Sequence, residues 1–267
     1  MLAPEVCVDV DRYPLLEPAS SRARRVVEDA KRELARAGLA VLPGFLRRDA
    51  LGPLVRECGA LAQRGHFSEV HGTPYIEPPD LSCPEGHPRR TPGRTALSAV
   101  AYDRFPPASA LRALYEWDPL REFLRVLLGR ARLFRYADPL GALNLAVMRD
   151  GDELAWHFDQ TDFVVSLALQ SSEAGGEFEC VPRIRSDDDE RYDAVRQVLD
   201  GETKPSVVPM TPGTLMLFEG RRSLHRVSRI RGATPRYVAL LAYDTKPGTD
   251  SSALLKRVRY GRLPGEA

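Results

Sequence analysis

Apolar positions in the first 129 residues recur with the three- and four-residue spacing of helices. Over residues 20–38 this spacing, with Gly38 as a C-terminal stop, predicts an amphipathic helix. The same pattern predicts helices over residues 49–63, 109–117 and 118–129, and the last of these begins at an Asp-Pro start signal. The first part of the chain is therefore expected to be mainly helical.

Two segments of this part, which spans residues 1–129, depart from the helical pattern. Residues 39–42 form a short apolar run that is ended by Pro-Gly, which predicts a strand. Residues 66–92 are rich in Pro, Gly, Ser and His and show no period, which predicts a long loop. Loops of this length in compact domains usually act as lids or binding segments.

After Gly129 the pattern changes to short apolar or alternating runs separated by Gly, Pro and Asp. Such runs at regular spacing predict a sandwich or barrel. A helical run with an acidic first turn interrupts them over residues 186–200. We therefore expect one α+β domain over residues 1–267, with a β-rich core over 130–245 and an extension over 246–267. The predicted strands lie in ARLFRYAD, ALNLAVMRD, DFVVSLALQ, GEFECVP, GTLMLFEG and RYVALLAYD.

Composition places the chain among globular proteins, with 43% hydrophobic and 28% charged residues. The formal net charge of +1 argues against a nucleic-acid partner, because such proteins usually carry a basic excess. The start of the chain does not resemble a signal peptide, no apolar run is long enough to cross a membrane, and the four cysteines show no metal-binding spacing. A cytoplasmic protein is expected, either a monomer or a homodimer.

Two of the five histidines, His157 and His225, lie beside predicted strands of the β-rich core. Iron(II) in non-heme oxygenases is held by two imidazoles and one carboxylate on one face. Side chains two residues apart in an extended segment share a side, so His157 and Asp159 satisfy two of these positions, and His225 supplies the third from a distant strand. A His-x-Asp pair alone is weak evidence, since a polar loop before a strand would contain the same residues.

An arginine downstream of His225 strengthens the metal hypothesis. Arg236 begins the otherwise apolar run RYVALLAYD, and a guanidinium that enters a buried strand requires an anionic partner. A dicarboxylic co-substrate held by two parallel hydrogen bonds would meet this requirement. Pairing with an internal acid is the alternative. Arg231 is a competing candidate, but it precedes a Gly-Ala-Thr-Pro turn and is expected to be exposed.

The ordered set WHFD, GGEFE, PGTLMLFEG, LHRV and PRYVALLAYD resembles the iron(II)/2-oxoglutarate-dependent dioxygenases over about residues 142–245. The resemblance implies a double-stranded β-helix, or jelly roll, with the metal at its open end. It also implies that His157, Asp159 and His225 hold Fe(II), and that Arg236 binds the distal carboxylate of 2-oxoglutarate. The implied reaction consumes O2 and forms succinate and CO2.

More narrowly, the stretch from LNLAVMRDGDELAWHFD to SDDDERYDAV resembles the carrier-free amino-acid halogenases and their hydroxylase relatives. In the halogenases a glycine stands in place of the aspartate and leaves a coordination position for chloride. Asp159 fills that position here, so hydroxylation of an unactivated C–H bond is expected.

The same resemblance implies a small-molecule substrate, namely a free amino acid or a metabolite derived from one. Arg94, with Arg89 and Arg90 in the same basic stretch, is a candidate for binding a substrate carboxylate. Gln160, next to Asp159, is a second candidate for substrate contact, and Asn144 is a candidate for contact with the co-substrate.

Two other functions remain open at this level. The enzyme could hydroxylate a peptide or protein side chain, with residues 66–92 forming a peptide groove. Alternatively, a jelly-roll binding protein could use the same residues without any catalytic metal.

Overall fold

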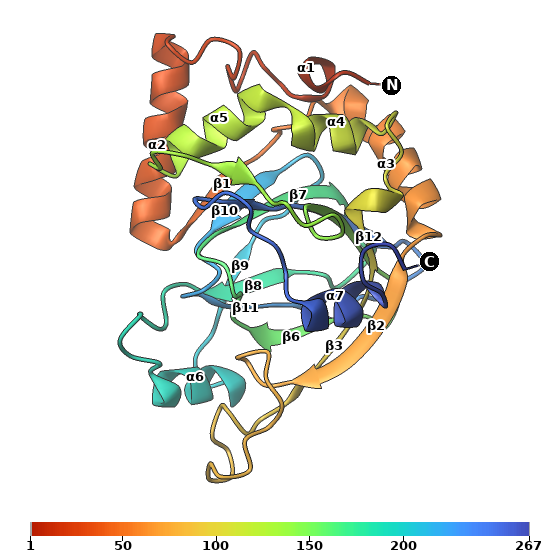
Figure 1. Cartoon of the computed structure of the whole chain (residues 1–267). Coiled ribbons are helices and arrows are strands. Elements are labelled where there is room, and N and C mark those ends of the chain that lie inside the picture. The colour runs from red at the N-terminus through yellow and green to blue at the C-terminus, as the bar shows by residue number, and fades with distance from the viewer. Residues whose placement is uncertain (1, 267) are drawn as a thin grey trace.

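The computed structural model describes residues 2–266, and its centre is a jelly roll of two facing antiparallel sheets (Figure 1). The larger sheet contains strands from both halves of the chain, whereas the strands of the smaller sheet all come from the second half. In order across the larger sheet, the strands are β1 (Leu39–Leu42), β10 (Leu215–Phe218), β7 (Val164–Gln170), β12 (Arg236–Leu241), β5 (Leu143–Met148), β3 (Gly93–Val100) and β2 (His66–Gly72). In the smaller sheet they are β6 (Leu154–His157), β11 (Leu224–Val227), β8 (Phe178–Val181) and β9 (Ser206–Val208). The α+β jelly roll expected from the sequence is confirmed.

Alternate side chains of the larger sheet point to its opposite faces and therefore belong to two different hydrophobic cores. In β5, Leu145 and Val147 pack with the helices on the outer face, whereas Ala146 and Met148 pack with residues of the smaller sheet. A strand covered on both faces is apolar at nearly every position, and every residue of β5 is buried. Asn144, the polar residue of β5, shares the inner face with Ala146 and Met148 and therefore points into the space between the sheets.

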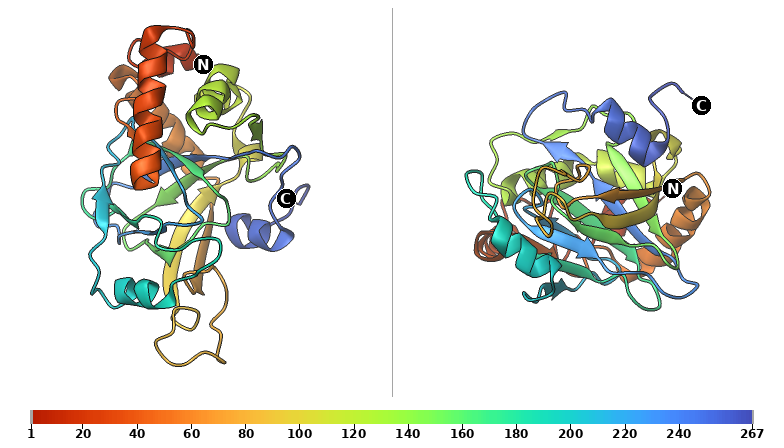
Figure 2. Two further views of the ribbon diagram at one scale, coloured as in Figure 1. Left: turned by 90° about the vertical axis from the view of Figure 1, so that its left-hand side faces the viewer. Right: turned by 90° about the horizontal axis from the view of Figure 1, so that it is seen from below.

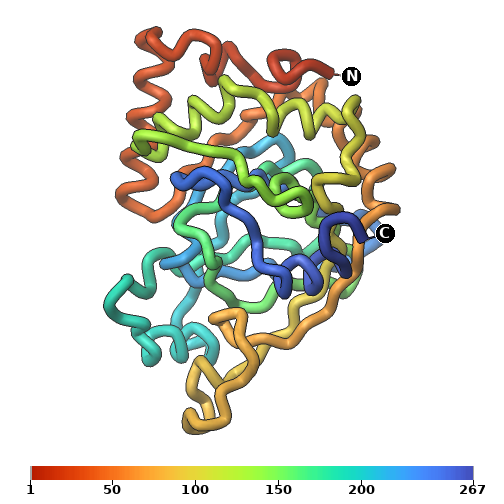
Figure 3. The backbone as a smooth tube through the Cα atoms, viewed as in Figure 1, coloured from red at the N-terminus to blue at the C-terminus, as the bar shows by residue number. Residues whose placement is uncertain are grey.

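The outer face of the larger sheet is covered by the N-terminal helices and by the chain over 110–127 (Figures 1 and 3). These are α1 (Pro4–Cys7), α2 (Ser21–Ala37), α3 (Arg48–Ala62), α4 (Ala110–Glu116) and α5 (Asp118–Leu127). Helix α2 begins where the Ser20 hydroxyl accepts a hydrogen bond from Ala23 N and ends at Gly38, whose φ of 69° suits glycine. The four longer helices confirm the helical predictions to within about two residues at each end.

The N-terminal part contributes more strand than expected. Residues 66–72 were expected to belong to a long loop, but they form strand β2, which pairs with β3 and leaves a loop only over 73–92. Strand β2 lies at the edge of the sheet and most of its side chains are exposed, so it shows no apolar alternation. The expectation of a loop over the whole of 66–92 was therefore wrong.

Other observed element boundaries also differ from the predicted ones. The insertion over 186–200 is helical only in α6 (Tyr192–Leu199), and the run ARLFRYAD forms only the two residues of β4 (Phe134–Arg135), which pair with β13 (Tyr243–Asp244). Within 246–267 the chain forms α7 (Ala253–Tyr260), which contacts β2 and β3. None of the helices within residues 2–266 is long and apolar enough to cross a membrane.

Three further segments flank the two sheets: the loop over 73–92, α6 and α7. The loop and α6 lie side by side, and Tyr75 of the loop packs against Tyr192 of α6 with ring centroids 6.0 Å apart (Figure 2). Helix α7 lies against the β2–β3 hairpin. The buried Lys256 of α7 forms ion pairs with Asp138 and Asp250 and so holds the helix on the core.

Candidate metal and co-substrate site

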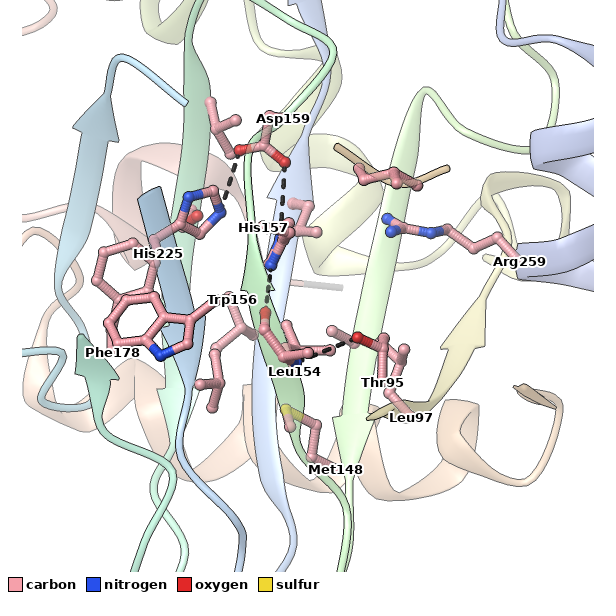
Figure 4. A pocket seen from close by; sticks show the side chains of 18 of the residues that line it. Thr95, Leu97, Met148, Leu154, Trp156, His157, Asp159, Phe178, His225 and Arg259 are labelled. Atoms are coloured by element: carbon pink, nitrogen blue, oxygen red, sulfur yellow. Dashed lines mark hydrogen bonds and ion pairs between the residues drawn. The ribbon is translucent and has the colours of Figure 1, made fainter. Parts of the chain in front are cut away.

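The smaller sheet brings the two predicted histidines face to face. His157 is the last residue of β6, His225 lies in β11, and the antiparallel register places them directly opposite each other. Their ring centroids are 4.2 Å apart. Asp159 follows β6 by two residues, and its backbone N–H donates to Gly220 O at 3.1 Å. The structure thus brings together His157, Asp159 and His225 (Figure 4).

Backbone carbonyls define which nitrogen of each ring faces the aspartate. His157 Nδ1 lies 2.8 Å from Ala155 O, and His225 Nδ1 lies 2.9 Å from Ser223 O. A carbonyl oxygen only accepts hydrogen bonds, so each Nδ1 carries the proton and each Nε2 presents a lone pair. This second hydrogen bond is the usual way in which a metal-binding histidine is oriented.

The three ligand atoms therefore all present lone pairs to a common point. His225 Nε2 lies 3.3 Å from Asp159 Oδ2, and His157 Nε2 lies 3.9 Å from Asp159 Oδ1. Asp159 Oδ2 is buried and has no hydrogen-bond partner within residues 2–266. Buried acceptors that face one another without a donor are unfavourable unless a cation lies between them. The donor set, two imidazoles and one carboxylate, fits iron(II).

Burial keeps one of the imidazoles neutral. Desolvation, followed by the neighbouring His225, lowers the pKa of His157 to about 4. A neutral ring at pH 7 keeps its Nε2 lone pair for a metal. His225 is only 4% exposed and packs against Phe178 and Phe218, whose ring centroids lie 5.5 and 4.9 Å from its own.

Arg236 is a buried cation without a carboxylate partner in the described chain. It begins β12, is 7% exposed, and the one hydrogen-bond contact of its guanidinium is to Met148 Sδ at 3.8 Å. Burial lowers its pKa to about 10, so it remains charged at neutral pH. It lines the same cavity as His157, Asp159 and His225. A cavity with a metal triad and an unpaired guanidinium suits a ligand that combines a chelating group with a second carboxylate.

The other candidates lie in different places. Asn144 and Gln160 line a second cavity that also reaches Asp159, and not the first cavity with Arg236. Arg94 lies in β3 outside both cavities. Its guanidinium donates to Gly151 O at 2.9 Å, to Glu153 at 3.1 Å and to Glu69 at 2.9 Å. Arg231 is exposed, as expected from its turn.

Two residues beside the site were not found from the sequence. Arg259 points from α7 toward the metal-binding residues, as Figure 4 shows, and borders both cavities. Gly220 lies beside Asp159. An amphipathic helix was not expected after residue 246, and a single glycine after a strand carries no signal of its own.

One family model matches the chain. The family model of halogenase D matches residues 90–256, which is more than half of the chain. No curated protein matches significantly.

Solved structures share the fold at low identity. A 2OG-Fe(II) oxygenase family oxidoreductase from Burkholderia pseudomallei is 17% identical, with a TM-score of 0.53 over 84% of this chain and 92% of its own. AviO1 from Streptomyces viridochromogenes Tue57 is 16% identical, with a TM-score of 0.57 over 84% and 97%. The epimerase SnoN from nogalamycin biosynthesis is 16% identical, with a TM-score of 0.57 over 91% and 92%.

Proposed function

The chain belongs to the halogenase D family, and on that premise we propose that it is a non-heme iron(II)- and 2-oxoglutarate-dependent dioxygenase that hydroxylates a small molecule. The proposed substrate is a free amino acid or a metabolite derived from one. The proposed reaction converts R–H, 2-oxoglutarate and O2 into R–OH, succinate and CO2.

The observation that carries the proposal is Asp159 beside two imidazoles whose Nε2 atoms face it. The carboxylate completes a two-histidine, one-carboxylate ligand set, whereas the halogenases that the sequence resembles have glycine at this position. With this ligand in place, the coordination position that chloride would take is filled. Hydroxylation is therefore favoured over halogenation.

Metal binding and co-substrate binding are assigned to different residues. His157, Asp159 and His225 would hold the iron, and Arg236, which borders the same cavity, would bind the far carboxylate of 2-oxoglutarate. Iron(II) supplies the oxygen activation, and 2-oxoglutarate supplies two of the electrons. The apolar lining of the cavity, which includes Met148, Phe218 and Val238, limits access of water.

Solved relatives support a small substrate by analogy. One of them is the epimerase SnoN, solved with Fe3+, alpha-ketoglutarate and nogalamycin RO. Another is the carbocyclase SnoK from nogalamycin biosynthesis, which is 14% identical. A prolyl hydroxylase from Trichoplax adhaerens, solved with a peptide fragment, represents the alternative of a peptide substrate.

The test uses anaerobic protein loaded with iron(II) and 2-oxoglutarate. We expect a weak visible charge-transfer band and, after addition of O2 and a pool of free amino acids, a product heavier by one oxygen atom together with succinate. Asp159→Ala is expected to abolish the oxygenated product. Asp193→Ala, a highly exposed carboxylate in α6, is the matched control and is expected to retain both signals. Absence of the band from the unaltered protein would contradict the proposed function.

A further inference from the structure

Arg259 is a cation beside the proposed iron site for which the described chain provides no acceptor. It lies in the last turn of α7, is partly buried, and donates no hydrogen bond and forms no ion pair within residues 2–266. Figure 4 shows its guanidinium pointing into the pocket toward His157 and Asp159. A partly desolvated guanidinium without an acceptor has an unmet requirement for an anion.

Apart from Arg236, which is assigned to the co-substrate, the arginines around Asp159 do not share this property. Arg221 pairs with Asp162 at 2.7 Å, Arg185 pairs with Glu190 at 2.7 Å, and Arg89 pairs with Glu77 at 3.3 Å. All three border a hollow beside Asp159, and Arg221 also borders the cavity that contains Arg259. Each of these three guanidiniums has a carboxylate partner within the protein, so Arg259 is the better candidate for binding an external anion.

Arg259 forms one wall of a cavity that we name the α7 chamber, which is also lined by Tyr136, Asn144, Asp159 and Leu240. The chamber adjoins the metal-binding cavity, because Asp159, Leu240 and Arg259 border both. A molecule in the chamber would therefore lie next to the iron without occupying the cavity of Arg236.

The floor of the chamber contains an unsatisfied acceptor. Asn144 is 6% exposed, and its Oδ1 is buried without a hydrogen-bond partner in the described chain. Apart from the proposed metal ligand Asp159, the carboxylates that border the chamber are already engaged: Asp162 by Arg221, Asp244 by Thr249 Oγ1, and Asp250 by Lys256. Asn144 is thus a group on the floor that can accept from the N–H or O–H of a bound molecule.

We propose that the α7 chamber binds the substrate, with Arg259 holding its carboxylate and Asn144 Oδ1 accepting a hydrogen bond from its ammonium or hydroxyl group. This inference rests on the proposed function, since it assumes an iron site at Asp159. It identifies the substrate class as a small carboxylate that also carries a hydrogen-bond donor, and it assigns α7 to substrate recognition.

The co-substrate does not need Arg259. Arg236 is more deeply buried than Arg259 and borders only the metal-binding cavity of the two, where the far carboxylate of 2-oxoglutarate would be shielded from water by the apolar lining. Arg259 is partly exposed at the rim, where a substrate arrives from solvent. A planar guanidinium can bind a carboxylate through two parallel hydrogen bonds, whereas lysine offers only a single charged group.

The experiment compares Arg259→Gln and Arg259→Lys with the unaltered protein and with Arg257→Gln. Arg257 is the matched control because it lies on the same helix, is exposed and pairs with Glu266 at 3.1 Å. Two signals are recorded: the anaerobic iron(II)–2-oxoglutarate band, and succinate formation stimulated by a pool of amino acids and other small carboxylates. A pool of the corresponding carboxamides tests whether the negative charge is needed.

We expect Arg259→Gln to keep the band but to lower pool-stimulated kcat/KM by roughly 10- to 100-fold, the value of a lost charged hydrogen bond. Arg259→Lys should retain part of the stimulation, Arg257→Gln all of it, and the carboxamide pool should not stimulate the unaltered protein. Loss of the band in Arg259→Gln would assign Arg259 to the co-substrate and overturn the inference.

Stimulation of Arg259→Gln equal to that of the unaltered protein would also overturn the inference. The inference would also be overturned if the unaltered protein shows a normal band but no carboxylate stimulates its succinate formation. In that case the assignment of the iron and co-substrate residues would stand. If the unaltered protein shows no band, the proposed function itself fails.

Discussion

Gly220 leaves the space that the carboxylate of Asp159 occupies. A Cβ atom at position 220 would lie 2.9 Å from both Cβ and Cγ of Asp159, closer than real Cβ contacts allow. The φ angle of Gly220 is not in the left-handed region, so the need for glycine here comes from the contact and not from the backbone. The third metal ligand and a glycine 61 positions later are therefore a matched pair.

Gly220→Ala is expected to displace the Asp159 carboxylate and to weaken iron(II) binding by about 10- to 100-fold, as removal of groups that orient a ligand usually does. Anaerobic titration of iron(II) in the presence of 2-oxoglutarate measures the change. Gly59→Ala in α3 is the matched control, because a Cβ there meets no atom within 4 Å. This control should leave iron binding unchanged and stabilise the fold by about 0.5–1 kcal/mol.

A double-mutant cycle isolates the contact between the two residues. In an Asp159→Gly background no carboxylate remains for the new methyl group to meet, so Gly220→Ala should no longer lower the free energy of unfolding. The measurement is urea unfolding of the metal-free proteins. Equal destabilisation in both backgrounds would show that residue 220 acts through something other than Asp159.

Arg236→Met should separate stability from co-substrate binding. Because burial leaves the guanidinium charged at neutral pH with a pKa of about 10, its desolvation opposes folding at every working pH below that value. Methionine removes the charge, so the metal-free variant should be more stable by about 1–3 kcal/mol. Its KM for 2-oxoglutarate should rise about 100-fold or more, since charged hydrogen bonds are lost. A less stable metal-free variant would show that Arg236 is paired in solution.

Lys256→Met tests whether α7 is held by its buried ion pairs. Lys256 is 5% exposed and Asp138 is 1% exposed, so removing the ammonium leaves a buried carboxylate uncompensated, at a cost of about 3 kcal/mol. We expect faster hydrogen exchange in residues 253–260 and unchanged exchange in β5. Lys204→Met, at an exposed position, is the control and should change neither. Unchanged protection of α7 in Lys256→Met would show that apolar packing alone holds the helix.

Metal binding should stabilise the protein through the three ligands. At a concentration of free manganese(II) or anaerobic iron(II) about 100 times Kd, the folded state should gain about 2.7 kcal/mol, which corresponds to roughly 5–10 °C in Tm. Addition of EDTA should reverse the shift. His225→Ala should show no shift, whereas His71→Ala, on the exposed strand β2, should behave like the unaltered protein.

The β-rich core could be predicted from the sequence because strands covered on both faces form apolar runs. β5, β7, β10 and β12 each follow this pattern and were expected within a few residues. β2 was not expected, because an edge strand with exposed side chains carries no apolar periodicity. β6 and β11 were also missed, since four-residue strands beside a metal site contain polar residues at inner positions.

The candidate metal ligands could be predicted because residue types and their order along the chain are enough to suggest a metal site. Neither Arg259 nor Gly220 could be found in this way. Arg259 reaches the site only because α7 packs against the β2–β3 hairpin, which is a long-range contact. The interactions of Arg94 with Glu69 and Glu153 likewise depend on strand pairing that local sequence does not reveal.

The direct pairing of His157 with His225 in the smaller sheet has a consequence for how this fold diversifies. The backbone hydrogen bonds of β6 and β11 hold both imidazoles in register, while residue 159 belongs to the turn after β6. Substitution at 159 can therefore alter the ligand count at the metal without disturbing that register. The fold itself is shared with structures that are only 16% identical to this chain.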